Sequence, residues 1–268
     1  MTGDIENFKI HETAVVENKR NIADGCVVGP FCLIGKDVKL GKRVKLHSHV
    51  VIVGNTIIGD DTVVWPFASI GHQPQDLKYK GESTTLIIGE RNKIRESVSI
   101  NPGTKGGGGL TKIGDDCLFM LGSHVGHDCI IGNSVVVANN SAIAGHVVIG
   151  DRVTIGGLSG IHQFCRIGEG AMVGALSMVT NDIVPFTTVV GERPKLSGLN
   201  LIGLKRLGVS TKIINDLRRL YNDLFNPSRN FKNQAKLLSI QGASNEYEDK
   251  ILSFILSDSS RSFLTPKI

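Results

Sequence analysis

Four of the eight histidines lie close together in the middle of the chain: His124, His127, His146 and His162. An imidazole can take up and return a proton near neutral pH, so such a cluster suits general acid–base catalysis or metal binding. Asp128 directly follows His127, and a neighbouring carboxylate can fix the tautomer of a histidine base. Gly145 follows His127, and Gln163 follows Gly145, by the same number of residues. His146 follows Asp128 by this interval as well. If residues separated by this interval are neighbours, the sequence predicts one polar column with His127 as base and Asp128 as the residue that orients it.

The interval is three times a shorter repeat of six residues. Apolar anchors recur in one phase as far as residue 100 and, after a glycine-rich stretch, in a second phase to residue 179. A period of six fits neither the 3.6-residue turn of a helix nor the alternation of a strand. It is typical of hexapeptide repeats, in which three hexads form one triangular coil of a parallel β-helix. The anchors are Ile10, Val16, Ile22, Val28, Ile34, Leu40, Leu46, Ile52, Ile58, Val64, Ile70, Ile88, Ile94 and Ile100, then Ile113, Phe119, Val125, Ile131, Val137, Ile143, Ile149, Ile155, Ile161, Ile167, Val173 and Val179.

Two further positions of the hexad carry small residues. Glycine often follows the anchor, as at Gly59 and Gly132, and we expect it to supply the φ values that tight corners require. Four residues after the anchor a small residue recurs, and we expect it to share the core with the anchor. All five cysteines occupy that position, so we expect core packing and neither disulfides nor a metal site.

The repeats divide the chain into two predicted domains. Residues 1–186 form the β-helix, interrupted by a polar loop at about 72–86 and a glycine-rich loop at about 101–112 that lacks the P-loop motif. Residues 187–268 form a small helical domain that covers the end of the β-helix, and the periodicity becomes helical from Leu196 onward. The expected fold is therefore mainly β with a C-terminal α-helical domain.

Three amphipathic helices are expected in the second domain. Ser210 can cap the first, and Asn226-Pro227 can end it. The apolar residues expected to face the core are Ile213, Leu217, Leu220 and Leu224 in the first helix, Leu237, Leu238 and Ile240 in the second, and Ile251, Leu252, Ile255 and Leu256 in the third.

Charge and hydropathy narrow the classes of partner. Residues 187–268 hold 13 basic and 7 acidic groups, a net charge of +6, which suits an acidic partner or a phosphorylated ligand. Basic and aromatic residues are not interleaved, so nucleic acid is not expected. With no run of 18 apolar residues and no signal-peptide pattern at the N-terminus, we expect a cytoplasmic protein without stable membrane insertion.

Seven strings carry a more specific signal than the hexads: QDLKYKGE (75–82), IRESVSI (94–100), GGGLTKIG (107–114), HVGHDC (124–129), AGHV (144–147), IHQFC (161–165) and GLNLIGLKR (198–206). Together they closely resemble the UDP-N-acetylglucosamine O-acyltransferases of lipid A biosynthesis. The resemblance implies a left-handed β-helix and a homotrimer with sites between subunits. It also implies transfer of a 3-hydroxy fatty acyl group from acyl carrier protein to UDP-N-acetylglucosamine, without a metal or other cofactor. Acyl carrier protein is acidic, which agrees with the basic C-terminal domain.

The resemblance also implies a role for individual residues. His127 is the general base that takes the proton from the glucosamine 3-hydroxyl, Asp128 orients it, and the backbone N–H of Gly145 stabilises the oxyanion. His124 supports the acyl donor. Residues implied to contact the nucleotide sugar or its phosphates are Asp76, Lys78, His146, Gln163, Asn200 and Arg206. The floor of the acyl groove is expected at Met172, Ala175, Leu176 and Met178 in the last coils.

The chain departs from the family pattern at three places. Asn101, followed by Pro102, stands where His-Arg is expected, and Ile202 and Leu207 replace an acidic and a basic residue near the ligand. These changes bear on the uridine diphosphate contacts. Because some members acylate a 3-amino sugar, Asn101 keeps an amine acceptor open as an alternative.

Two other functions compete for the histidines. A γ-class carbonic anhydrase also has hexapeptide repeats and binds zinc through three histidines, but its H-x4-H pair is absent from this sequence. A non-catalytic scaffold needs neither the polar column nor the matching strings.

Overall fold

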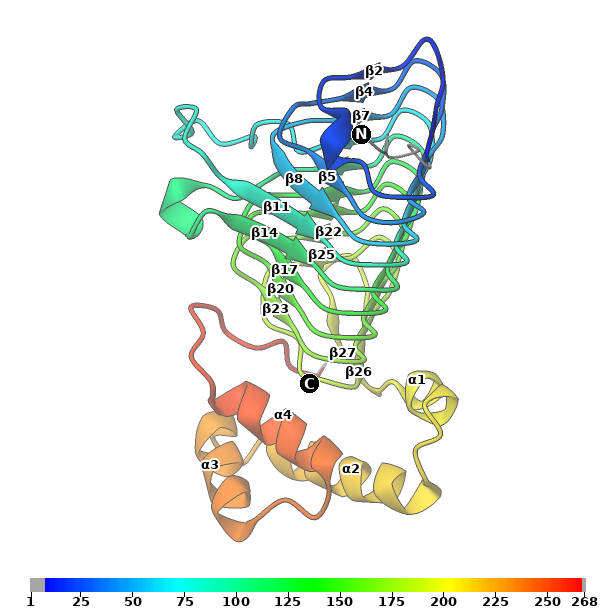
Figure 1. Ribbon diagram of the computed structural model, residues 1–268. Helices are drawn as coiled ribbons and strands as arrows, with labels where there is room; N and C mark the ends of the chain where they lie inside the picture. Colours follow the sequence, from blue (N-terminus) through cyan, green and yellow to red (C-terminus); the bar gives the residue numbers. More distant parts are fainter. Residues whose placement is uncertain (1–7, 267–268) are drawn as a thin grey trace.

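Each hexad forms a short strand followed by a tight turn. Its anchor and the small residue four positions later both point into the core. The computed structural model describes residues 8–266, so the first seven residues of the predicted 1–186 domain lie outside the described part. It shows a three-sided parallel β-helix with four helices at one end (Figure 1).

Three sheets form the three sides, and all their strands are parallel except the last strand of sheet A, which turns back antiparallel. Sheet A runs through β1 (Lys9–Ile10), β3 (Val27–Val28), β6 (Lys45–Leu46), β9 (Val63–Val64), β12 (Lys93–Ile94), β15 (Leu118–Phe119), β18 (Val136–Val137), β21 (Thr154–Ile155), β24 (Met172–Val173), β26 (Thr187–Val190) and β27 (Lys195–Leu199). Sheet B runs through β2 (Val15–Val16), β4 (Leu33–Ile34), β7 (Val51–Ile52), β10 (Ser69–Ile70), β13 (Ser99–Ile100), β16 (His124–Val125), β19 (Ala142–Ile143), β22 (Gly160–Ile161) and β25 (Met178–Val179). Sheet C runs through β5 (Lys39–Leu40), β8 (Asn55–Ile58), β11 (Thr85–Ile88), β14 (Leu110–Ile113), β17 (Ile130–Ile131), β20 (Val148–Ile149) and β23 (Arg166–Ile167).

The pairing register confirms the predicted coil of three hexads. Leu118 pairs with Val136, three hexads further along the chain, in the next coil of sheet A. Where the polar loop intervenes, Val63 pairs with Lys93, which lies five whole hexads further on, so the phase is kept. Where the glycine-rich loop intervenes, Lys93 pairs with Leu118, which lies four hexads and one residue further on. The extra residue is the phase shift seen in the sequence.

The narrow core contains the predicted residues. From Ile22 to Val179 the anchors are buried, and the small residues four positions later are buried beside them. The five cysteines are free and buried, and the thiol of Cys129 donates to the carbonyl of Ala144 at 3.1 Å. Burial raises the pKa of the Cys129 thiol to about 12 and that of Cys117 to about 11, which makes both unreactive.

The glycines after the anchors have a different role from the predicted one. Gly71 has a positive φ of 81°, but the regular left-handed position lies two residues further on, usually at non-glycine residues such as Asp61 (φ 57°) and His146 (φ 62°). A Cβ on Gly59 would lie 2.6 Å from the carbonyl carbon of Gly89 in the next coil. Close stacking of coils therefore requires these glycines, and the φ expectation was wrong.

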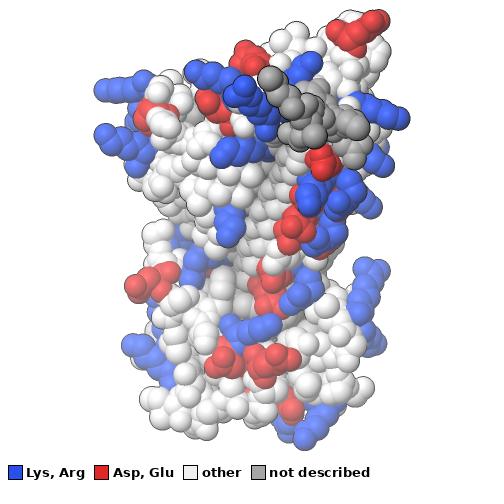
Figure 2. All heavy atoms as spheres, in the orientation of Figure 1, with Lys and Arg blue, Asp and Glu red and all other residues white. Residues whose placement is uncertain are grey.

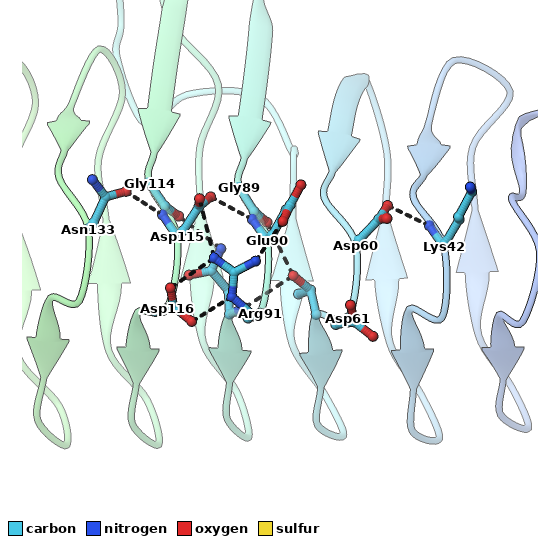
Figure 3. Close-up of polar contacts among 12 residues, drawn as sticks. Lys42, Asp60, Asp61, Gly89, Glu90, Arg91, Gly114, Asp115, Asp116 and Asn133 are labelled. Carbon is cyan, nitrogen blue, oxygen red and sulfur yellow. Dashed lines mark hydrogen bonds and ion pairs between the residues drawn. The ribbon is translucent and has the colours of Figure 1, made fainter.

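Acid and amide side chains cap the turns between sheets C and A (Figure 3). The backbone N–H of Lys42 donates to Asp60 Oδ1 at 2.7 Å, and that of Glu90 donates to Asp115 Oδ1 at 2.8 Å. Asp115 in turn donates its own N–H to Asn133 Oδ1 at 2.8 Å. Each side chain thus satisfies a backbone donor of the preceding coil, and we call this series the corner ladder.

Four helices follow the sheets: α1 (Leu201–Arg206), α2 (Thr211–Leu224), α3 (Phe231–Gln241) and α4 (Glu246–Leu256). Two short 3-10 turns, η1 (Lys19–Asn21) and η2 (Lys105–Gly107), lie in the repeat domain. Ser210 caps α2 as predicted. The helices form a second core with Val184 and Phe186, so they cover the end of the β-helix as expected. None of the described helices is both long and apolar enough to cross a membrane.

Two expectations for this region were wrong. Helical structure does not start at Leu196, because β27 first turns back antiparallel to β26 and extends sheet A to Leu199. The predicted core faces also differ: in α3, Leu237 and Ile240 are exposed, and Gln234 and Ala235 are buried in their place. At the end of α4, Leu256 is exposed as well. On the face drawn in Figure 2, acidic and basic side chains both occur over the helices, so the excess positive charge forms no single patch there.

Candidate active site

His127 and Asp128 lie on the turn that links β16 to β17, between sheets B and C. Because one coil takes three hexads, the next two coils bring Gly145 and Gln163 beside His127, as predicted. These three residues and His124 line one cavity of about 460 Å³. His162 lines it as well, and its Nδ1 lies 2.8 Å from Nη2 of Arg261 in the C-terminal segment.

His127 and Asp128 form a close pair. Nδ1 of His127 lies 2.7 Å from Oδ2 of Asp128. The Asp128 side chain is only 1% exposed, whereas that of His127 is 16% exposed and reaches the cavity. A buried carboxylate at Nδ1 leaves Nε2 as the ring nitrogen that can accept a proton from a ligand.

Gly145 lies directly over the ring of His127. A Cβ at this position would be 2.6 Å from Cε1 and 2.7 Å from Nε2 of the ring. Within residues 8–266 no acceptor receives the backbone N–H of Gly145. An unpaired N–H beside a base is a donor available to a developing oxyanion.

His146 lies one coil beyond Asp128, in contact with both members of the pair. Its Nε2 is 3.9 Å from Asp128 Oδ2, and its ring meets that of His127 edge-on at 5.0 Å. The other face stacks on Phe164 at 4.4 Å. Burial lowers the pKa of His146, which favours the neutral ring.

His124 projects from β16 into the same cavity. Its Nδ1 is 2.8 Å from the hydroxyl of Ser99 on the neighbouring strand β13. Burial, and then the nearby His127, lower the pKa of His124. The ring is therefore held neutral beside the base.

The residues that surround Asp128 were not predicted from the sequence. The Thr104 N–H and hydroxyl both donate to the carboxylate, at 2.8 and 2.6 Å, and Asp128 donates its own N–H to Thr111 Oγ1 at 2.7 Å. A Cβ on Gly107 would overlap the carboxylate. No periodic signal could reveal these contacts, because the glycine-rich loop folds back over the site outside the hexad register.

The polar loop places its predicted residues next to the site but in a separate cavity. Asp76 and Lys78 line a space of about 540 Å³ with Thr104 and Lys105, whereas the preceding residue, Gln75, lines the cavity of His127. The two loops are therefore neighbours on one side of the base.

Asn200 and Arg206 are not brought to His127 within one chain. They line a third cavity, of about 450 Å³, with Met172, and the departures Ile202 and Leu207 lie there too. Asn200 caps α1 by accepting the N–H of Gly203 at 3.0 Å.

The four predicted groove residues are spread over two sides of the β-helix. Met172 lines the cavity of Asn200, whereas Met178 lines the cavity of His127. Ala175 and Leu176 are exposed on the turn between β24 and β25, which joins sheets A and B.

Asn101, one of the departures from the family pattern, lies at the candidate site. It is 5% exposed and lines the cavity of His127, and its Nδ2 donates to the carbonyl of His72 at 3.1 Å. Its Oδ1 has no hydrogen-bond partner among the described residues. A buried acceptor in this position can receive an O–H or N–H of a ligand.

One group of described residues has the composition of a metal site. The ligand atoms of His127, Asp128 and His146 all lie within 4.8 Å of one another. Oδ2 of Asp128 already accepts the Thr104 hydroxyl and lies against Nδ1 of His127, which is the arrangement of an oriented base. The contacts therefore favour acid–base chemistry at this group.

Comparison with known proteins identifies relatives along the whole chain. Residues 182–264 match the family profile described as "Udp N-acetylglucosamine O-acyltransferase; Domain 2". Residues 37–72, 110–145 and 146–181 match "Bacterial transferase hexapeptide (six repeats)". The chain is 55% identical over 204 residues to the acyl-[acyl-carrier-protein]--UDP-N-acetylglucosamine O-acyltransferase of Paracoccus denitrificans, covering 76% of this chain and 77% of the relative. It is 43% identical over 261 residues to that of Rhizobium johnstonii, covering 97% and 96%.

Comparison with solved structures gives the same result as comparison of sequences. A UDP-N-acetylglucosamine acyltransferase crystal structure superposes with a TM-score of 0.89 at 44% identity, covering 98% of each chain. The UDP-N-acetylglucosamine acyltransferase of Campylobacter jejuni gives 0.90 at 36% identity, covering 97% of this chain and 100% of the other. A superposition this complete requires the β-helices to wind with the same hand.

Proposed function

The chain belongs to the UDP-N-acetylglucosamine O-acyltransferase family, and from this membership we propose that it transfers a 3-hydroxy fatty acyl group from acyl carrier protein to the glucosamine 3-hydroxyl of UDP-N-acetylglucosamine. This reaction would be the first step of lipid A biosynthesis. The left-handed winding and the absence of a cofactor, both implied by the resemblance, are part of the same proposal. So are the cytoplasmic location and the absence of a nucleic-acid partner or stable membrane insertion, which the sequence led us to expect.

His127 is the proposed general base. Its Nε2 takes the proton of the 3-hydroxyl while that oxygen attacks the thioester carbonyl carbon, and Asp128 holds the ring and stabilises the imidazolium. The Gly145 N–H donates to the resulting oxyanion. Collapse of the tetrahedral intermediate breaks the carbon–sulfur bond, and the proton on His127 passes to the departing thiolate. The observation that carries this proposal is the His127–Asp128 pair lying beneath an unpaired N–H.

The nucleotide sugar is proposed to span two copies of the chain. Asp76, Lys78, His124, His146 and Gln163 are the proposed binding residues on the side of His127. Asn200 and Arg206 are the proposed binding residues on the other side. Because those two line a different cavity from His127 in one chain, a ligand that contacts both sets must lie between subunits. This separation supports the predicted homotrimer.

The acyl chain is proposed to run along the last coils, past Met172, Ala175, Leu176 and Met178, where neighbouring subunits meet. A larger side chain would shorten the groove. We expect Ala175→Met to shift the preference toward shorter acyl donors, measured as relative kcat/KM over a series of acyl carrier proteins. An unchanged chain-length profile would remove Ala175 from the groove.

The test is an acyl-transfer assay on metal-stripped protein with UDP-N-acetylglucosamine and 3-hydroxyacyl carrier proteins of several chain lengths. We expect transfer by the wild type and at least about a hundredfold loss in His127→Ala. Transfer that requires added zinc would instead favour a metal-dependent reaction at His127, Asp128 and His146.

The unpartnered Oδ1 of Asn101 favours one second candidate, in which the acceptor is the corresponding 3-amino sugar. An amine has two hydrogens, so it can give one to His127 and offer the other to this acceptor atom while its lone pair attacks the thioester, whereas the one hydrogen of a hydroxyl goes to His127. The same assay with both acceptors in competition distinguishes the candidates by whether the product is an ester or an amide. We expect Asn101→His to lower any preference for the amine.

A further inference from the structure

We propose that Thr104 is a positioning residue for the base, because it holds both oxygens of the Asp128 carboxylate and so imposes the catalytic tautomer on His127. The inference rests on the proposed function, since it assigns a part in the proton transfer at His127. Thr104 lies well before Asp128 in the chain, in the glycine-rich loop.

The contacts of Thr104 involve both oxygens of the carboxylate. Oδ1 of Asp128 accepts the backbone N–H of Thr104 at 2.8 Å, and Oδ2 accepts its hydroxyl at 2.6 Å. Oδ2 also faces Nδ1 of His127 at 2.7 Å. Thr104 is 5% exposed and the Asp128 side chain 1% exposed, so water does not compete for these bonds.

The direction of each hydrogen bond follows by elimination. A backbone N–H can only donate, so Oδ1 must accept from Thr104. The Gly107 N–H donates to Thr104 Oγ1 at 3.2 Å, which leaves the Thr104 hydroxyl hydrogen to point at Oδ2. Both carboxylate oxygens thus accept a hydrogen from Thr104, which stabilises the ionised form of Asp128. The carboxylate then takes its third hydrogen bond from His127 Nδ1, so Nε2 carries the free lone pair.

The loop also limits where the carboxylate can move. A Cβ on Gly107 would overlap the Asp128 carboxylate, so the loop packs directly against it. The backbone of Asp128 is fixed from the other side by the Thr111 hydroxyl at 2.7 Å, in a left-handed conformation with φ of 59°. Asp128 thus has one available position, and Thr104 supplies the donors in it.

Removing the Thr104 hydroxyl has a specific consequence for catalysis. Among the described side chains Oδ2 then keeps His127 as its one hydrogen-bond donor, with His146 Nε2 further away at 3.9 Å, and its negative charge favours the protonated His127 ring. A base that holds its proton more tightly is inactive over a wider acidic range. The acidic limb of kcat/KM should therefore move to higher pH, and kcat should fall because the ring is less well oriented.

The experiment compares Thr104→Val with Thr104→Ser in the full-length protein, using the acyl-transfer assay from pH 5 to 9. For Thr104→Val we expect about a tenfold to hundredfold loss of kcat, a KM for the nucleotide sugar within about threefold of wild type, and an acidic limb shifted upward by about 0.5 to 1 pH unit. Thr104→Ser keeps the hydroxyl and should restore both the rate and the limb.

Thr111→Val is the matched control, because it removes a buried hydroxyl that contacts the backbone of Asp128 and not its carboxylate. It can lower the unfolding temperature, but its acidic limb should coincide with that of the wild type. Gly107→Ala crowds the carboxylate while the Thr104 hydroxyl is kept, and it should reproduce the slower rate, which keeps the test informative if Thr104→Val does not fold.

The outcomes separate the two proposals. Wild-type protein that transfers no acyl group to either acceptor contradicts the proposed function. If the wild type is active, either of two results contradicts the positioning role alone. One is a folded Thr104→Val protein whose acidic limb of kcat/KM does not move. The other is a Thr111→Val protein whose acidic limb moves as far as that of Thr104→Val. Full activity in Gly107→Ala would also contradict it.

Discussion

Individual side chains at the active site are held by contacts that leave little room for substitution. His127 has Asp128 at one ring nitrogen and the backbone of Gly145 against its face. His146 is enclosed between His127 and the ring of Phe164. Preorganised groups of this kind stabilise a transition state without rearrangement during the reaction.

A methyl group at position 145 tests this arrangement directly. We expect Gly145→Ala to lower kcat by at least about a hundredfold, because its Cβ must displace the His127 ring and disturb the proposed oxyanion donor. The measurement is steady-state acyl transfer, with the unfolding temperature followed in parallel. Activity within about threefold of the wild type would show that the ring tolerates the methyl group and that Gly145 is not in contact with the reaction.

Two histidines make the stability of the protein depend on pH. Burial lowers the pKa of His124 and His146, so the unfolded chain binds more protons than the folded protein as pH falls below the unfolded value of about 6.5. Their neutral forms are accommodated fully above that value, and stability is lost as pH falls toward the folded values. We expect a lower unfolding temperature at pH 5 than at pH 8.

Glutamine variants assign this pH dependence. His124→Gln and His146→Gln should each reduce the difference between the unfolding temperatures at pH 8 and pH 5. His11→Gln, which changes an exposed histidine near the start of the β-helix, should leave the difference intact. If the difference between the two unfolding temperatures is equal in the wild type and all three variants, the pH dependence belongs to other groups.

Coils and turns are held together by regular contacts that recur along the solenoid. In the corner ladder each acid or amide pairs with a backbone N–H that would otherwise lie unpaired at a tight turn. The same position takes Asp115 in one coil and Asn133 in the next. The two side chains thus share the oxygen acceptor and not the charge.

Substitution at position 115 separates acceptor from charge. Asp115→Ala leaves the Glu90 N–H without its acceptor and should destabilise the protein by about 1 to 2 kcal/mol. Asp115→Asn keeps the oxygen and should stay within about 0.5 kcal/mol of the wild type. Thermal unfolding of the three proteins at one concentration measures both differences, and equal losses in the two variants would mean that charge dominates.

The sequence pattern predicted those parts of the fold and the site that follow the regular six-residue period. The anchors from Ile113 to Val179 recur at every sixth position. This period predicted that they are buried and that His127, Gly145 and Gln163 lie near one another. The glycine role was misread because the left-handed residue lies two positions further along. Thr104 was missed because a loop returns to the site without any period. In α3, Leu237 and Ile240 suggested a core face that tertiary packing does not use.

At the scale of the whole molecule, the proposed ligand-binding residues lie in two separate cavities of one chain. His127 lies in one cavity, and Asn200 and Arg206 lie in another beside α1. The individual positions were predictable from the resemblance, but their separation was not, because it depends on where the chain leaves sheet A. The proposed homotrimer, with its sites between subunits, would bring the two cavities to one ligand.

Mixed trimers test this organisation. His127→Ala and Arg206→Ala variants, each inactive alone, should recover activity when co-expressed, because some interfaces then combine an intact His127 from one subunit with an intact Arg206 from another. Random assembly predicts about a quarter of the wild-type activity per site. No recovery in mixtures shown by mass spectrometry to contain both variants would place the whole site within one chain.

The five buried thiols of the β-helix have a practical consequence. Each cysteine points into the core, and burial raises the pKa of Cys117, Cys129 and Cys165, so few thiolates form near neutral pH. A single cysteine introduced on the surface, for example at the exposed Leu237 of α3, would react with maleimide dyes far faster than the native thiols. Fluorophores or spin labels could thus be attached to the wild-type background at one chosen place per subunit, and distances between subunits could be followed during turnover.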